Sequence, residues 1–126
     1  MTTSADAGWQ SALLAHRHDV GGGLKLVEVR VAPHVAETYT SPGQYVRIRV
    51  SGAEGFFVLA NEPGTAAWNL ILRGGGGASD VLLAATPGTA LESTRALGSG
   101  FPMARARGRP LVVALGGAGI AVGRPL

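Results

Sequence analysis

Glycine and proline interrupt the whole chain and limit what it can fold into. The 126 residues include 20 glycines and seven prolines, which leaves little room for long helices. Helical bundles and coiled coils are therefore excluded. Intrinsic disorder is excluded as well, because 46% of the residues are hydrophobic and only 15% are charged, against about 25% in typical globular domains. The composition predicts a compact, turn-rich domain that buries roughly two-thirds of its unfolded surface.

Charge and cysteine content exclude several classes of function. The net charge is +3, and apart from Arg105, Arg107 and Arg109 the cations are scattered, so no basic stripe for nucleic acid is present. The chain has no cysteine, which excludes thiol catalysis and cysteine-based metal sites and fits a reducing compartment such as the cytoplasm. The first residues do not resemble a signal peptide, and no stretch approaches the roughly 20 apolar residues that span a bilayer. We expect a soluble, cytoplasmic protein that binds neither nucleic acid nor membranes.

Short apolar runs between turn residues predict six β-strands. A change in the phase of the apolar positions at Leu26 and Val27 indicates a β-bulge in the second strand. The even spacing of the runs is typical of a β-barrel or sandwich. The predicted strands cover residues 10–16, 24–31, 45–50, 56–60, 68–73 and 90–94.

The third predicted strand has the clearest alternation. Val46, Ile48 and Val50 share one face, which indicates a half-buried antiparallel strand. The opposite face carries a tyrosine and two arginines that either face solvent or line an anionic ligand. These residues are Tyr45, Arg47 and Arg49.

A run of four glycines precedes the single predicted helix. Gly74–Gly77 leads to Ser79, which we expect to be the N-cap of a short helix that ends before Pro87. Glycines at the start of a helix let backbone N–H groups approach a phosphate or pyrophosphate. Because no P-loop lysine follows them, a flexible turn without a ligand is the alternative.

The C-terminal segment has a different composition from the rest. After a polar linker at residues 105–109, the apolar run Leu111–Leu115 predicts a strand buried on both faces, and a Gly-Gly-Ala-Gly sequence follows it. This is how an α/β nucleotide-binding domain begins, although a strand docked on the barrel is the alternative. We divide the chain into a disordered N-terminus (1–8), a barrel domain (9–104), the linker (105–109) and an incomplete α/β domain (110–126).

Other catalytic patterns are weak. His16 and His18 share one face of a strand, but neither they nor His34 has a carboxylate at a spacing that suits a metal ion. No serine lies in the Gly-x-Ser-x-Gly turn of a hydrolase. We therefore predict no metal site and no catalytic side chain.

Five segments, taken in order over residues 9–126, resemble the ferredoxin-NADP reductase family, and most of all the branch that holds the electron-transfer subunit of dihydroorotate dehydrogenase. The resemblance implies a six-stranded antiparallel Greek-key barrel that binds FAD, or sometimes FMN. It also implies a following α/β domain for NAD(P)H and hydride transfer from nicotinamide to flavin. The segments are SPGQYVRIRV, FFVLAN, LILRGGGGASDVLL, PGTALESTRALGSGF and LVVALGGAGIA.

The resemblance also implies which residues contact the cofactor. FFVLAN is similar to the family's Arg-x-Tyr-Ser motif, with Phe57 at the aromatic position, Val58 at the hydroxyl position and Gly55 at the arginine position. Two polar contacts are thereby lost, so we expect weakened or altered flavin binding unless Arg47, Arg49 or Arg73 substitutes. The implied flavin-binding residues are Phe57, Val58, Leu59, Ala60 and Asn61, with Gly76, Gly77, Ala78 and Ser79 at the pyrophosphate.

The sequence thus favours an FAD-binding barrel domain of an NAD(P)H-linked oxidoreductase or electron-transfer subunit. NAD(P)H itself would bind only if a complete second domain is supplied. The alternative is a barrel without cofactor that acts as a binding or assembly module. In either case an apolar strand at residues 111–115 would favour pairing with a second copy of the chain or with a partner polypeptide.

Overall fold

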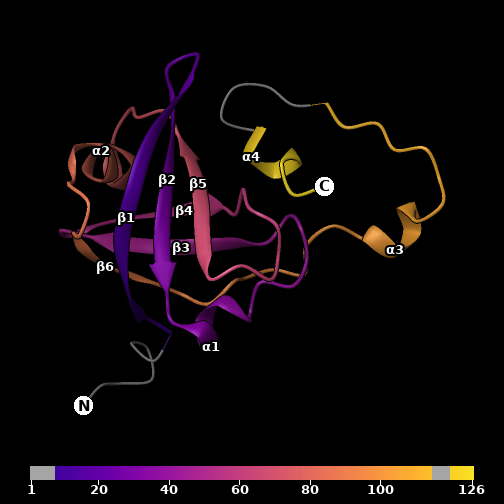
Figure 1. Ribbon diagram of the computed structural model, residues 1–126, viewed down its shortest axis with the longest axis horizontal. Helices are drawn as coiled ribbons and strands as arrows, with labels where there is room; N and C mark the ends of the chain where they lie inside the picture. The colour runs from indigo at the N-terminus through magenta and orange to yellow at the C-terminus, as the bar shows by residue number, and fades with distance from the viewer. Residues whose placement is uncertain (1–7, 115–119) are drawn as a thin grey trace.

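Six antiparallel strands form one curved sheet, as the computed structural model shows (Figure 1). It describes residues 8–114 and 120–126. The strands are β1 (Gln10–Gly21), β2 (Leu24–Val31), β3 (Tyr45–Val50), β4 (Ala53–Val58), β5 (Ala67–Leu72) and β6 (Ala90–Ser93). The helices are α1 (Pro33–Ala36), α2 (Gly77–Ala84), α3 (Met103–Ala106) and α4 (Ile120–Gly123).

The strand order β4-β3-β6-β1-β2-β5 confirms the predicted Greek-key arrangement, because β6 returns to lie between β1 and β3. No ladder joins β4 to β5 within the described residues, so the barrel is open along this seam. One end of the seam is nevertheless closed, since the Ala60 N–H donates to the Asn69 carbonyl at 2.8 Å. The fold is therefore a barrel with one partly open side.

The core lies on the concave face of the sheet and follows the alternation seen in the sequence. Val46, Ile48 and Val50 of β3 are buried, which confirms that prediction, while Tyr45 and Arg47 on the other face are exposed. β2 and β5 contribute further alternate positions to the same core. The largest fully buried side chain is Trp68 of β5. The remaining members from β2 and β5 are Val27, Val29, Val31, Leu70 and Leu72.

The β-bulge lies in β1, and its prediction at Leu26 and Val27 in β2 is wrong. The pairing of β1 with β2 shifts between Leu14 and His16, and again near the hairpin end. The phase change in β2 has another cause, because Leu24 packs on the outer face of the sheet against a small second cluster. That cluster includes Ala121 of α4, so α4 covers the outer face beside β5 (Figure 1).

The helices correct two predictions. The described residues form four helices where one was expected, although α1, α3 and α4 have only four residues each. The longest helix, α2, begins three residues earlier than predicted, with Gly76 at its N-cap and Ser79 inside its first turn. The four glycines all adopt positive φ, which only glycine does without strain, so the chain turns into the helix before it reaches Ser79.

The predicted strand at residues 111–115 is not formed. Residues 111–114 have no regular structure and are exposed, with Val112 93% accessible, and Leu115 lies outside the described residues. A strand buried on both faces needs neighbours, and the six strands of the sheet pair among themselves. The predicted linker is also partly helical, because α3 includes Arg105.

Two other predictions lie largely outside the described residues. The disordered N-terminus was expected at residues 1–8, of which only Gly8 is described. The Gly-Gly-Ala-Gly sequence at residues 116–119 is not described either.

Candidate functional site

The glycine loop joins the end of β5 to the start of α2. Gly74, Gly75, Gly76 and Gly77 have φ angles of 89°, 116°, 125° and 60°. The loop folds back onto the helix, because the Gly75 N–H donates to the Asp80 carboxylate at 2.9 Å. The Asp80 carboxylate therefore accepts from a glycine N–H that was expected to bind a phosphate.

The first turn of α2 keeps further backbone donors. The N–H groups of Gly77, Ala78 and Ser79 precede any carbonyl that could accept from them within the helix. They also lie at the positive end of the helix dipole, which favours an anion. Asp80 partly opposes this, because its negative charge lies in the same turn. The main chain at this position can hold a phosphate, but with a carboxylate beside it.

Strand β4 faces this helix start through Gly55 and Phe57. A Cβ at Gly55 would lie 3.2 Å from the Phe57 ring and 3.3 Å from the Ala78 Cβ. Three residues that the sequence assigned to the cofactor or its motif therefore meet in one place. The Phe57 ring lies over Gly55 and packs partly against the core, so it occupies the space that a longer side chain at residue 55 would take.

The last residues of the FFVLAN segment hold the barrel together. Leu59 and Ala60 are fully buried, and their N–H groups donate to the carbonyls of Gln44 and Asn69. The Ala60 N–H is thus used in the seam and is not available to a flavin. Val58 is half-buried and pairs with Tyr45 of β3.

Asn61 completes the closure of the seam. Its Oδ1 accepts from the Asn69 N–H at 2.9 Å, and its Nδ2 donates to the Glu62 carbonyl at 3.0 Å and to the Thr65 hydroxyl at 2.9 Å. Its own carbonyl accepts from the Tyr39 hydroxyl at 2.7 Å, and burial raises the pKa of that hydroxyl to about 12. Both ends of the Asn61 side chain are therefore used inside the protein.

The outer face of β3 and β4 carries a cluster that the sequence only partly indicated. Arg47 pairs with Glu54, and its guanidinium lies 5.6 Å from the centroid of the Phe56 ring. Phe56, which was not among the predicted residues, is 66% exposed and makes an edge-on contact with Tyr45. The β3–β4 register places Phe56 directly opposite Arg47, and the sequence alone does not show this pairing.

Arg49 is held in the same cluster. It pairs with Glu92 at 2.9 Å, and its guanidinium lies 4.2 Å from the centroid of the Trp9 ring. Both arginines of the alternating row are therefore paired with carboxylates and stacked on rings, which favours the interpretation that they face solvent.

The histidines make no metal centre within the described residues, where no group of three or more ligating side chains is found. The rings of His16 and His18 lie 5.9 Å apart on β1, and His34 is near Gln10. Within residues 8–114 and 120–126, no helix is long and apolar enough to cross a membrane.

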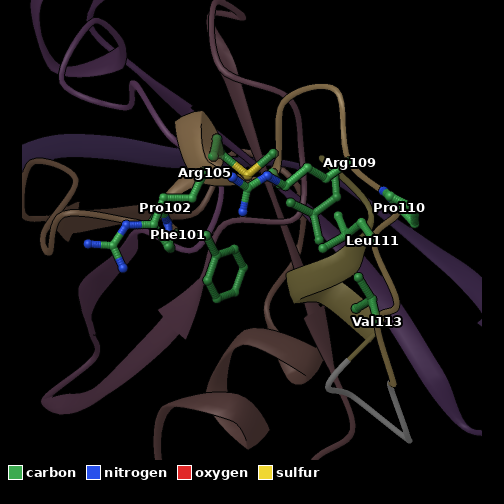
Figure 2. Close-up of a pocket in the computed structure, with 10 residues that line it drawn as sticks. Phe101, Pro102, Arg105, Arg109, Pro110, Leu111 and Val113 are labelled. Atoms are coloured by element: carbon green, nitrogen blue, oxygen red, sulfur yellow. The ribbon is translucent and has the colours of Figure 1, made fainter.

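A hollow lies between α3 and the C-terminal residues, built from other residues than the glycine loop (Figure 2). It has a volume of about 420 Å³ and mostly apolar walls, to which Phe101, Leu111 and Val113 contribute. Arg105 and Arg109 also line this hollow. Leu111 and Val113 belong to the segment that was predicted to be a buried strand.

No protein-family model and no curated protein matches the chain. Solved structures do match it. The cytochrome P450 reductase GcoB of Amycolatopsis is 26% identical with a TM-score of 0.75, and the match covers 92% of this chain and 38% of that one. Phthalate dioxygenase reductase is 16% identical with a TM-score of 0.71, over 98% of this chain and 40% of that one. The chain shares the fold of the ferredoxin-NADP reductase family.

This result confirms the fold of the family that the sequence indicated. The cytochrome b5 reductase domain of Ulva prolifera nitrate reductase has the same fold, with 16% identity and a TM-score of 0.59 over 71% of this chain and 40% of that one. The resemblance to the dihydroorotate dehydrogenase branch is not supported by these matches and stays a prediction. The chain spans about two fifths of the length of each of these three reductase chains.

Proposed function

We propose that this chain is the FAD-binding barrel domain of an NAD(P)H-linked oxidoreductase or electron-transfer subunit. The observation that carries the proposal is the meeting of Gly55 and Phe57 of β4 with Ala78 of α2, at a helix start whose first N–H groups have no acceptor within the helix. GcoB and phthalate dioxygenase reductase are both reductases, and the second is described as transferring electrons from pyridine nucleotides.

The main chain fits the cofactor better than the side chains do. The N–H groups of Gly77, Ala78 and Ser79, with Gly76 at the N-cap, would hold the pyrophosphate of FAD. Phe57 would provide an apolar wall for the flavin, next to Val58, once its ring moves off Gly55. When bound, the flavin would accept a hydride from nicotinamide and pass the electrons onward.

Leu59, Ala60 and Asn61 would act less directly. Their contacts with Gln44 and Asn69 fix the end of β4 and so position Phe57 and Val58 beside the helix. We propose that these three residues support the site, while Phe57 and the loop touch the cofactor.

The remaining parts of the assignment are proposals too. Residues 105–109 would link the barrel to residues 110–126, which would begin an NAD(P)H-binding α/β domain in a longer protein. The exposed residues Leu111–Ala114 would then pair with further strands, from a partner polypeptide or a second copy. A cytoplasmic location is supported by the lack of cysteine.

Titration of the purified chain with FAD, followed by quenching of flavin fluorescence, tests the proposal. Asp80→Asn should bind FAD more tightly than the natural chain, because it removes a negative charge beside the pyrophosphate and keeps an oxygen that accepts from Gly75. Riboflavin, which has no phosphate, is the control and should bind both proteins equally. A chain that takes up neither FAD nor FMN would support the cofactor-free module instead.

A further inference from the structure

The phosphates of a bound flavin nucleotide need a positive partner at this site. Asp80 already brings a negative charge to the first turn of α2, and the helix dipole supplies only about half a charge. Gly55, the β4 residue that faces the helix start, has no side chain. A cation from another position would therefore balance the phosphates if they bind here.

Two of the three arginines considered from the sequence are committed elsewhere. Arg47 pairs with Glu54, and Arg49 pairs with Glu92 while it stacks on Trp9. Both therefore lie in the outer cluster of β3 and β4, where moving them would break an ion pair and a ring contact.

Arg73 remains. It directly follows β5 and precedes Gly74, the first residue of the glycine loop. Its side chain is exposed, and among the described residues no hydrogen bond, ion pair or ring contact holds it.

The loop brings this position close to the helix start. The Asp80 carboxylate lies 2.9 Å from the Gly75 nitrogen and 3.1 Å from where a Cβ at Gly74 would be. Arg73 is the next residue along the chain, and an arginine side chain is long enough to cover a loop of this size. Its planar guanidinium can also bind two phosphate oxygens at once.

We propose that Arg73 is the cation that binds the phosphates of the flavin nucleotide, in place of an arginine on β4. The inference rests on the proposed function and adds a specificity to it. Because Arg73 would contact only the phosphates, it would favour FAD over riboflavin and leave the contacts with the ring unchanged.

The test compares Arg73→Gln with Arg95→Gln in titrations with FAD and with riboflavin. Arg95 is a matched control, because it is also exposed and its side chain has no recorded partner among the described residues. Arg73→Gln should weaken FAD binding about tenfold, as expected for a lost charge-assisted hydrogen bond, and should leave riboflavin binding unchanged. Arg95→Gln should change neither, and Arg73→Lys should recover part of the affinity for FAD.

Salt dependence gives a second readout. The affinity of the natural chain for FAD should fall as salt is added, and this fall should be smaller in Arg73→Gln. The proposal is overturned if Arg73→Gln binds FAD as tightly as Arg95→Gln does, or if it loses FAD and riboflavin equally. If the natural chain binds riboflavin and FAD but Arg73 has no effect, only this proposal fails. If it binds no flavin at all, the proposed function fails with it.

Discussion

Replacement of Asn61 by alanine tests whether this residue closes the barrel seam. The change removes three side-chain hydrogen bonds and leaves the Asn69 N–H of β5 without its acceptor. A neutral hydrogen bond contributes about 0.5–1.5 kcal/mol, and a partly buried donor left without a partner costs about 1–3 kcal/mol. Because water can replace some of these contacts at the partly exposed end, we expect Asn61→Ala to lower the free energy of unfolding by about 2–4 kcal/mol.

This loss is large for a chain of this size. Natural domains are stable by only about 5–15 kcal/mol, so the variant should unfold at clearly lower urea concentration and its Tm should fall by roughly 6–20 °C. Urea unfolding followed by circular dichroism measures the free energy. Hydrogen exchange measures the local effect, because the amide of Asn69 should lose protection while amides in the β1–β2 pairing should not.

Asn69→Ala is the matched control. The backbone N–H and C=O of Asn69 make the seam contacts, and no hydrogen bond of its side chain is recorded among the described residues. Its replacement should therefore change the free energy of unfolding by less than about 0.5 kcal/mol. Equal effects of the two substitutions, or a loss below about 0.5 kcal/mol for Asn61→Ala, would refute the role of the Asn61 side chain in closing the seam between β4 and β5.

Two further changes probe the site and the seam. Gly55→Arg should tighten FAD binding about tenfold without affecting riboflavin, because it places a cation next to the start of α2. The new side chain requires the Phe57 ring, 3.2 Å from the added Cβ, to move aside, and it also comes within 3.3 Å of the Ala78 Cβ. Gly55→Gln is the uncharged control, and equal gains in the two variants would contradict the electrostatic reason. Tyr39→Phe removes the bond to the Asn61 carbonyl and should cost about 1 kcal/mol in urea unfolding. Since burial raises the pKa of Tyr39 to about 12 from about 10, its neutral form stabilises the fold below pH 10 and this contribution is lost as the pH rises through 12. The natural chain should show this loss and Tyr39→Phe should lack it; identical pH profiles would exclude Tyr39 as its source.

The sequence by itself indicated the six strands of the barrel and the fold. The alternation of Val46, Ile48 and Val50 with polar neighbours defined β3, because a side-chain period of two is a local property of a strand. The glycine run marked the entry to α2, since positive φ angles are a property of single residues. Five ordered segments were enough to indicate the fold that the solved structures share.

Only the tertiary structure decided how these parts are used. The apolar phase change in β2 was interpreted as a bulge, but Leu24 instead covers a second cluster on the outer face, and nothing local to β2 reveals that α4 lies there. Asn61 was assigned to the cofactor, yet its Nδ2 donates to Glu62 and Thr65 of its own loop, and its Oδ1 accepts from the Asn69 N–H, which the closing of the barrel brings near.

The same reason explains the C-terminal segment and the arginines. Residues 111–114 have the composition of a buried strand, but pairing requires a neighbouring strand, and composition cannot supply one. The sequence does not distinguish Arg47, Arg49 and Arg73 as possible partners of a phosphate. The fold gives the first two a carboxylate and an aromatic ring, and it leaves the third exposed beside the glycine loop.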